Sequence, residues 1–201
     1  MSLKYPWNIV GLFQGYFKDR PTISQGYFNP GFYLEFIGFL SEVYFLLLYI
    51  PATTIAEPEF ALERNVFGVN EGPQALISLD NKTFLVYSAI YCGTDDYILG
   101  LLALKVGGNP MVKEDWTKST QPIFTQQPQN NAFGPGHNSF FKSPDGKESW
   151  IIYHANSSSN QGCADRRSIR MQKFSFKADG SPDFAVPVAT GLQVASPSGE
   201  S

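Results

Sequence analysis

Two titratable side chains occupy similar settings in this sequence and could take part in catalysis. Glu71 stands directly before a Gly-Pro pair in VNEGPQALI (69–77), and His137 follows a Gly-Pro-Gly triplet in GPGHNSF. A carboxylic acid that keeps its proton near neutral pH can protonate a leaving group, and an imidazole can hold a metal ion or a water molecule. On residue type alone, Glu71 could equally be a solvent-facing side chain of a turn. His137 could simply form a hydrogen bond that stabilises a turn.

Further candidates lie nearer the C-terminus. The segment RRSIR (166–170) places Arg167 and Arg170 in a basic cluster, and His154 ends the apolar run WIIYH. The arginines could pair with the Glu71 carboxylate or remain in a solvated loop. His154 is expected either to be a hydrogen-bonded strand residue or to line the rim of the same pocket.

Strands are the elements that must position these side chains. Short apolar or alternating runs are separated by turn signals such as Asp-Asn-Lys, Pro-Asp-Gly-Lys and Ala-Asp-Gly, and no segment has a strong 3.6-residue period. The pattern therefore predicts an all-β protein. The expected strands cover residues 44–50, 74–79, 83–89, 97–104, 138–142, 149–155 and 168–176.

The chain also contains an internal repeat. Residues 71–89 overlay residues 137–155 with a shift of 66, and each segment reads as a turn, a strand, a hairpin and a second strand that ends in Tyr-x-Ala. In this overlay Glu71 falls on His137. A repeat of several strands is typical of propeller blades, whose innermost strands line a central channel. The repeat therefore predicts that Glu71 and His137 face one shared pocket.

The composition excludes some classes of function. The chain has 201 residues, of which 43% are hydrophobic and 15% aromatic, with 18 Gly and 14 Pro. Such a chain can bury a substantial core. Its net charge of −3 provides no basic surface for nucleic acid. The two cysteines form no CxxC pair, which argues against a zinc site, and they could form one disulfide or none.

The N-terminal part differs from the rest. Residues 1–43 hold aromatics, Gly and Pro in no clear period, so we expect an atypical segment there and a β domain over residues 44–201. The first residues lack the continuous apolar region and the cleavage site of a signal peptide. The apolar stretch 36–50 is shorter than a membrane span and contains Glu42, so we expect a buried strand or core segment.

Several stretches together resemble glycoside hydrolase family 43, and in particular its α-L-arabinofuranosidase-like members. They are VNEGPQAL, YSA, DYILGLLAL, Trp116 with PIF, GPGHNSFFKSPDGKESWIIYHA and RRSIRMQKFSFKADGSPDF, within residues 44–195. The resemblance implies a five-bladed β-propeller, of which this chain would form about two to three blades. It also implies an extracellular hydrolase that cleaves arabinofuranosyl or xylosyl linkages of plant polysaccharides by inversion.

The resemblance assigns roles to single residues. Glu71 of NEGPQ matches the general acid, and His137 of GPGHNSF matches a histidine near a cation, often Ca²⁺, on the propeller axis. Arg167, with Arg170 as the alternative, matches an arginine that contacts the substrate. Inversion also requires a carboxylate on the opposite face of the sugar, about 6.5 to 9.5 Å from the acid, to activate water.

One departure from the family pattern concerns the other two carboxylates. The general base and the Asp that orients the acid should precede Glu71, but only Asp19 occurs in the first 70 residues, and its setting does not match the base motif. We therefore expect a truncated, C-terminal half of the propeller with weak or no hydrolytic activity. The alternative is a non-catalytic fragment or pseudoenzyme. Open sheet edges would then favour self-association.

Overall fold

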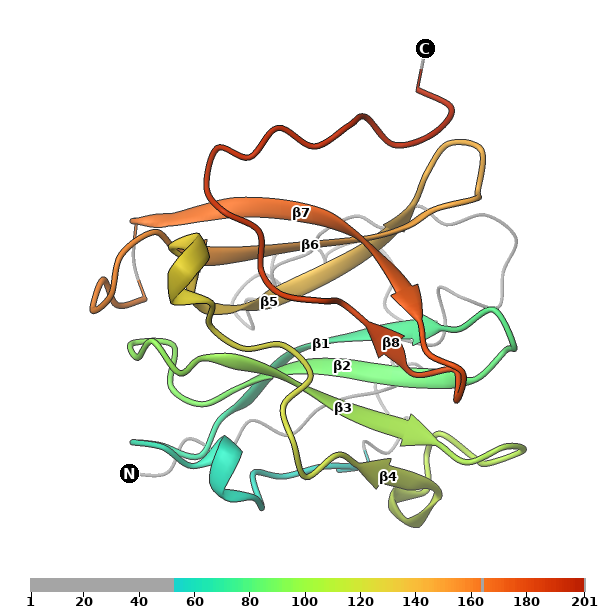
Figure 1. The fold of residues 1–201 in the computed structure, drawn as a ribbon. Helices are drawn as coiled ribbons and strands as arrows, with labels where there is room; N and C mark the ends of the chain where they lie inside the picture. The colour runs from blue at the N-terminus through green and yellow to red at the C-terminus, as the bar shows by residue number, and fades with distance from the viewer. Residues whose placement is uncertain (1–52, 164, 201) are drawn as a thin grey trace, which may run out of the picture. The chain divides into compact units, whose positions relative to one another are not determined.

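The computed structural model describes residues 53–163 and 165–200, and there the chain folds into two antiparallel sheets (Figure 1). The first sheet has the order β1-β2-β3-β4, and the second has the order β5-β6-β7-β8. The strands of the first sheet are β1 (Asn70–Ile77), β2 (Thr83–Ala89), β3 (Ile98–Leu104) and β4 (Trp116–Lys118). Those of the second are β5 (Phe133–Lys142), β6 (Ser149–Asn156), β7 (Arg167–Phe176) and β8 (Pro182–Asp183).

Each sheet is a meander in which consecutive strands pair, and this is the arrangement of a propeller blade. The first strand of the second sheet, β5, contacts β1, β2 and β3 of the first. In the part of the chain that the structure describes, three short 3₁₀ helices lie outside the strands: η1 (Ala61–Glu63), η2 (Lys113–Asp115) and η3 (Pro128–Asn130). The prediction of an all-β, propeller-type fold is confirmed, with two blades in the described residues.

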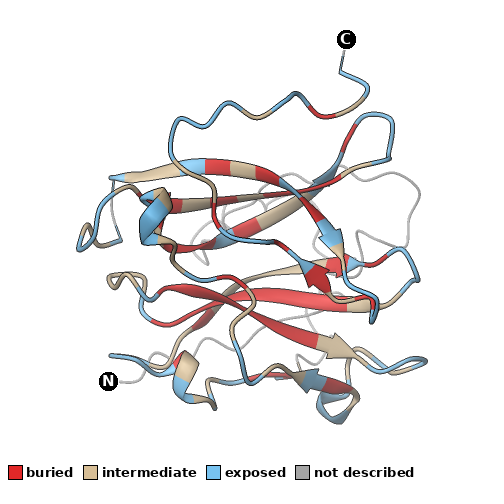
Figure 2. Cartoon of the chain, in the orientation of Figure 1, coloured by how far each residue is buried: buried red, intermediate tan, exposed pale blue. Residues whose placement is uncertain are grey.

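Burial of apolar side chains explains why these strands form. The middle strand β2 is buried along almost its whole length, as Figure 2 shows, so its sequence TFLVYSA is apolar on both faces. The core contains many aromatic rings, and Phe124 contacts Tyr153 and Phe184 edge to face, with ring centroids 4.9 and 5.9 Å apart. The core residues are Leu76, Phe84, Val86, Leu99, Leu101, Phe124, Ile151, Tyr153, Ala155, Phe174 and Phe184.

The Gly-Pro segments are bulged strands, and the prediction that they form turns was wrong. In β1, Glu71 pairs with Ser88 and Gln74 pairs with Val86, so one extra residue is accommodated between the two pairs. Gly72 adopts a left-handed φ of 54° at this bulge. Glycine suits the position because it has no Cβ to oppose such a φ.

The second unit repeats this bulge and corrects the overlay by one residue. In β5, Gly136 pairs with His154 and Ser139 pairs with Ile152, which is the pattern seen around Glu71. His137 has a φ of 52° and therefore occupies the bulge position, as Gly72 does. The structural equivalent of Glu71 is thus Gly136.

Some predictions fall outside the described residues. These are the atypical segment 1–43, the domain boundary at residue 44, the strand 44–50 and the apolar stretch 36–50. Among the residues that the structure does describe, no helix has the length and hydropathy needed to cross a membrane.

Candidate active site

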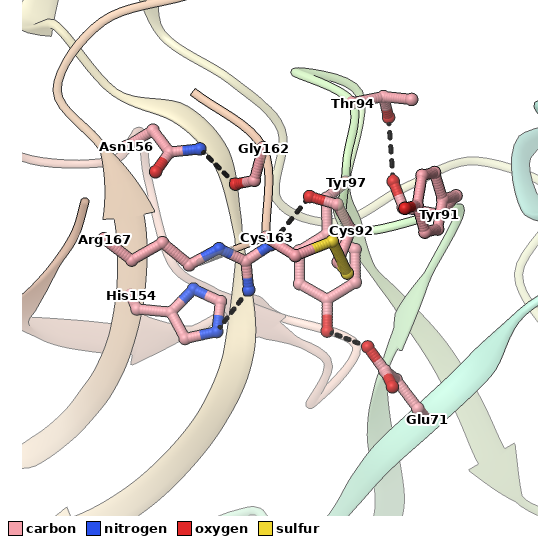
Figure 3. Close-up of a disulfide and its surroundings, with 10 residues drawn as sticks. All are labelled: Glu71, Tyr91, Cys92, Thr94, Tyr97, His154, Asn156, Gly162, Cys163 and Arg167. Atoms are coloured by element: carbon pink, nitrogen blue, oxygen red, sulfur yellow. Dashed lines mark hydrogen bonds between the residues drawn. A yellow bond between two sulfur atoms is a disulfide. The ribbon is translucent and has the colours of Figure 1, made fainter. Parts of the chain in front are cut away.

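The side chains singled out from the sequence gather at one end of the two sheets. Glu71 lies near the start of β1, His137 lies in the bulge of β5, His154 is near the end of β6, and Arg167 begins β7. Figure 3 shows Glu71, His154 and Arg167 around the ring of Tyr97, the residue that precedes β3. We call these five residues the Glu71 cluster.

Tyr97 holds the Glu71 carboxylate in place. Its hydroxyl donates a hydrogen bond of 2.5 Å to Glu71 Oε1, and its side chain is completely buried. Burial and the neighbouring carboxylate raise the pKa of Tyr97 well above its usual value of 10.0, so the hydroxyl remains a donor. Gly136 provides the space for the ring, because a Cβ there would lie 2.2 Å from Tyr97 Cε1.

The two histidines stack beside this tyrosine. The ring centroids of His137 and His154 are 5.9 Å apart, and those of His154 and Tyr97 are 6.0 Å apart, with nearly parallel planes in both pairs. The His137 ring lies over Gly72, where an added Cβ would meet it at 3.3 Å. The backbone N–H of His137 donates to Ser88 Oγ at 2.7 Å, and Ser88 is the residue that pairs with Glu71. His137 is therefore fixed next to the bulge that follows Glu71.

Arg167 connects the second sheet to the loop after β2. Its guanidinium lies 5.3 Å from the centre of the Tyr97 ring and donates to the carbonyl of Cys92 at 2.7 Å. A second contact joins Arg167 Nη1 and His154 Nε2 at 3.0 Å. Because arginine only donates, His154 must accept through Nε2 and carry its proton on Nδ1.

The imidazole of His154 is neutral in this setting. Burial, the positive charge of Arg167 and the proximity of His137 lower the pKa of His154 from 6.5 to about 4. Two buried donors of the cluster, His154 Nδ1 and Arg167 Nε, have no hydrogen-bond partner among the described residues. A polar ligand or a water molecule that accepted these hydrogen bonds would relieve the cost of burying them.

A disulfide between Cys92 and Cys163 supports this end of the structure (Figure 3). The sequence left open whether the two cysteines pair. In the structure, the disulfide joins the loop after β2 to the loop before β7. We call it the inter-loop disulfide. Asp95 adds to the connection by accepting hydrogen bonds from the Ser159 hydroxyl and from the Asn160 backbone, the latter at 2.9 Å.

Arg170 is placed away from the cluster. Only 4% of its surface is exposed, and its guanidinium donates to the backbone carbonyls of Val188 at 2.6 Å, Asn131 at 2.7 Å and Asn156 at 3.2 Å. These bonds tie the C-terminal segment and the loop before β5 to the second sheet. Of the two arginines, only Arg167 contacts the other residues considered for the site.

The expected Ca²⁺ ion near His137 finds few ligands in the described part of the chain. Calcium is bound mainly by carboxylate and carbonyl oxygens. Within residues 53–163 and 165–200, no group of three or more His, Cys, Asp or Glu side chains is placed to hold a metal. The Glu71 cluster also contains the Arg167 cation. The described residues alone therefore do not fit a calcium site, and the ion stays a prediction.

Sequence reasoning missed Tyr97. It was included in an expected strand, where a tyrosine in an apolar run indicates core. The second glycine of GPGH, Gly136, could have indicated such a neighbour. A glycine within a strand often marks a place where another group approaches the backbone closely. Here that group is the Tyr97 ring.

Comparisons with known proteins identify the family of this chain. A family model described as glycosyl hydrolases family 43 matches residues 47–182. Alpha-L-arabinofuranosidase 43 of Humicola insolens is 39% identical over 151 residues, which is 70% of this chain and 30% of that protein. An extracellular exo-alpha-(1->5)-L-arabinofuranosidase of Streptomyces avermitilis is 39% identical over 145 residues, with the same two coverages. The chain thus spans about a third of the length of these relatives.

Solved structures of glycoside hydrolases also match the fold of this chain. The crystal structure of an alpha-L-arabinofuranosidase from Lactobacillus brevis matches with a TM-score of 0.64 and 30% identity, over 70% of this chain and 44% of that one. A thermostable family-43 glycoside hydrolase matches with a TM-score of 0.60 and 25% identity, over 71% and 44% of the two chains.

Proposed function

Because the chain belongs to glycosyl hydrolases family 43, we propose that it acts on arabinofuranosyl linkages by inversion, with Glu71 as the general acid. The observation that carries the proposal is the Glu71 cluster itself. A carboxyl group accepts a hydrogen bond from a buried tyrosine, and Arg167 and His154 lie against the ring of that tyrosine. The His137 ring lies over Gly72, the residue after Glu71. The relatives that are named arabinofuranosidases support arabinose-containing polysaccharides as the substrate class; xylosyl linkages are the alternative.

The proposed reaction uses the two oxygens of Glu71 differently. Oε1 accepts the hydrogen bond from Tyr97, which leaves the other oxygen to carry the proton. That proton passes to the glycosidic oxygen as its bond to the anomeric carbon breaks. A water molecule attacks the anomeric carbon from the opposite face and gives its proton to a general base. We assign no described residue to the base, and we expect a carboxylate about 6.5 to 9.5 Å from Glu71 in that role.

Arg167 and His154 are proposed to bind the sugar. Both groups lie against the Tyr97 ring that holds Glu71, and an arginine and a histidine there could hydrogen-bond the hydroxyl groups of a pentose. Hydrogen bonds to the Cys92 carbonyl and to His154 already hold the Arg167 side chain in place. Arg167 therefore loses little conformational entropy when a sugar binds. Arg170 is proposed to have a structural role instead, since its guanidinium is saturated by backbone carbonyls.

The compartment is proposed to be extracellular. One relative is named an extracellular enzyme, and the inter-loop disulfide is the kind of bond that persists in oxidising surroundings. Self-association through exposed sheet edges also remains a prediction, and size-exclusion chromatography of the purified chain tests it.

Release of arabinose from an arabino-oligosaccharide, whose basic alkoxide leaving group needs protonation, tests the proposal, with Glu71→Gln compared with Glu114→Gln. Glu114 is an exposed residue of η2 and serves as the matched control. We expect Glu71→Gln to lower turnover by at least about 100-fold, which is the usual contribution of a general acid, and Glu114→Gln to keep it. Full turnover by Glu71→Gln would remove Glu71 from the mechanism.

The non-catalytic alternative requires a separate measurement. Calorimetric titration with an arabino-oligosaccharide reports sugar binding whether or not the chain turns the sugar over. Binding without turnover by the unmodified chain would favour a non-catalytic sugar-binding protein. Arg167→Met should then weaken binding, because it removes the guanidinium donors and keeps an apolar side chain of similar length.

A further inference from the structure

The sequence contains two Asn-x-Ser/Thr tripeptides that the proposed function does not use. They are Asn81-Lys82-Thr83 and Asn156-Ser157-Ser158, and neither has proline in the middle. This pattern is the acceptor for N-linked glycans in secreted proteins, but a folded protein tolerates the glycan only where the asparagine faces solvent. The structure places the two asparagines in opposite environments.

Asn81 lies at the tip of the hairpin between β1 and β2. It is exposed and adopts a left-handed φ of 61°, which asparagine accepts more readily than most residues. Its backbone N–H donates to the Ser78 carbonyl at 3.0 Å and closes the turn without help from its side chain. A glycan on the Asn81 side chain would therefore leave the hydrogen bond that closes the turn in place.

Asn156 is the last residue of β6 and is only 1% exposed. Its Nδ2 donates a hydrogen bond of 2.9 Å to the carbonyl of Gly162, which helps to fix the loop that carries the inter-loop disulfide. A glycan on this nitrogen would strain or break that bond and would need space that the fold does not provide. The folded chain is thus incompatible with modification at Asn156.

We propose that Asn81 is an N-glycosylation site of this protein and that Asn156 is not. The donor is an oligosaccharide linked through pyrophosphate to a lipid. In the transfer, a bond forms between Asn81 Nδ2 and the anomeric carbon of the oligosaccharide, the bond from that carbon to the pyrophosphate breaks, and the amide gives up one proton. The inter-loop disulfide fits the same compartment, because disulfides form where such transfer takes place.

The position of Asn81 suits a glycan in two further respects. It follows the end of β1, whereas Glu71 lies near its start, so about 20 Å of extended strand separates the hairpin from the cluster. Leu79, which is 79% exposed in the same hairpin, would be covered by the sugar. The glycan is therefore expected to reduce association of the chain and to leave the Glu71 cluster accessible.

The full chain, fused to a yeast secretion signal and secreted from yeast, tests the proposal. Enzymatic release of N-glycans converts the carrier asparagine to aspartate, and peptide mass spectrometry then locates it. We expect the conversion at Asn81 and none at Asn156. Thr83→Val should abolish the glycan although Asn81 is still present, and Ser158→Ala should leave it unchanged.

Two results would overturn the proposal. One is a secreted, disulfide-bonded chain with an unmodified Asn81, and the other is a glycan on Asn156 of that folded chain. Cell-free translation of the same signal-fused chain with endoplasmic-reticulum microsomes covers the case in which the chain is not secreted, because transfer to Asn81 can then be detected without folding. Absence of the modification in the microsomes would count equally against the site.

Discussion

Acidification from pH 7 to pH 5 should destabilise the fold through His154. The pKa of this imidazole falls from its usual 6.5 to about 4 because it is buried and faces the Arg167 cation and His137. The unfolded chain therefore binds a proton at a higher pH than the folded chain does. The stabilisation is fully present above pH 6.5 and is lost progressively as pH falls toward the folded pKa of about 4.

The size of the effect follows from the two pKa values. One pKa unit corresponds to about 1.4 kcal/mol, so the complete loss is about 3 kcal/mol, of which about 2 kcal/mol occurs between pH 7 and pH 5. Glu63 and Asp115 have pKa values below their usual 4.5 and 3.8, so their contributions disappear only at lower pH.

Urea unfolding at pH 7 and pH 5 measures the effect in the unmodified chain, His154→Gln and His137→Gln. The free energy of unfolding of the unmodified chain should fall by about 2 kcal/mol between the two pH values, and that of His137→Gln should fall by somewhat less, because His137 is the smallest of the three causes that lower the pKa of His154. His154→Gln should be less stable at pH 7 but nearly insensitive to pH in this range. An unchanged pH dependence in His154→Gln would refute the reasoning.

Three further predictions concern the stability of the fold. Gly136→Ala should displace the Tyr97 ring, which a Cβ would approach to 2.2 Å, and lower the free energy of unfolding by about 1 to 3 kcal/mol in urea; stability equal to that of the unmodified chain would mean the ring has room to move. Lys118→Met should leave the fully buried Glu63 carboxylate, 2.7 Å from Lys118 Nζ, without its cation and cost about 3 kcal/mol. A loss below about 1 kcal/mol would show that the hydrogen bonds from Tyr87 and the backbone suffice. Reduction of the inter-loop disulfide, which spans 71 residues, should lower the free energy of unfolding by about 4 kcal/mol, as a comparison of urea transitions with and without reductant would show.

The hairpin strands were predictable because their signal is local. Apolar runs bounded by turn residues gave 83–89 and 149–155, which match β2 and nearly match β6. The first strand of each sheet was predicted to begin too late in the sequence. Its Gly-Pro pair indicates a turn when only the local sequence is considered. Pairing with the next strand overrides that preference, and the bulge accommodates the extra residue. Such pairing is not visible in the segment itself.

The site was predictable only in part. The repeat predicts that Glu71 and His137 face one pocket, and the structure places the His137 ring over Gly72, the residue after Glu71. Their equivalence was wrong by one residue, because the alignment of the two segments does not show which residues of each bulge pair with the next strand. Arg167 and Arg170 are three positions apart on β7, so they point to opposite faces, and strand register alone decides which one reaches the cluster. Tyr97 was missed because its partner, Glu71, is distant in sequence.

The dependence of turnover on the leaving group tests the central claim, that Glu71 delivers a proton, most directly. A series of aryl α-L-arabinofuranosides whose phenols differ in acidity is hydrolysed by the unmodified chain and by Glu71→Gln. An acid catalyst matters most for basic leaving groups, since acidic phenols depart without protonation. We predict that the loss in Glu71→Gln grows steeply as the phenol becomes less acidic. An equal loss across the series would contradict the assignment.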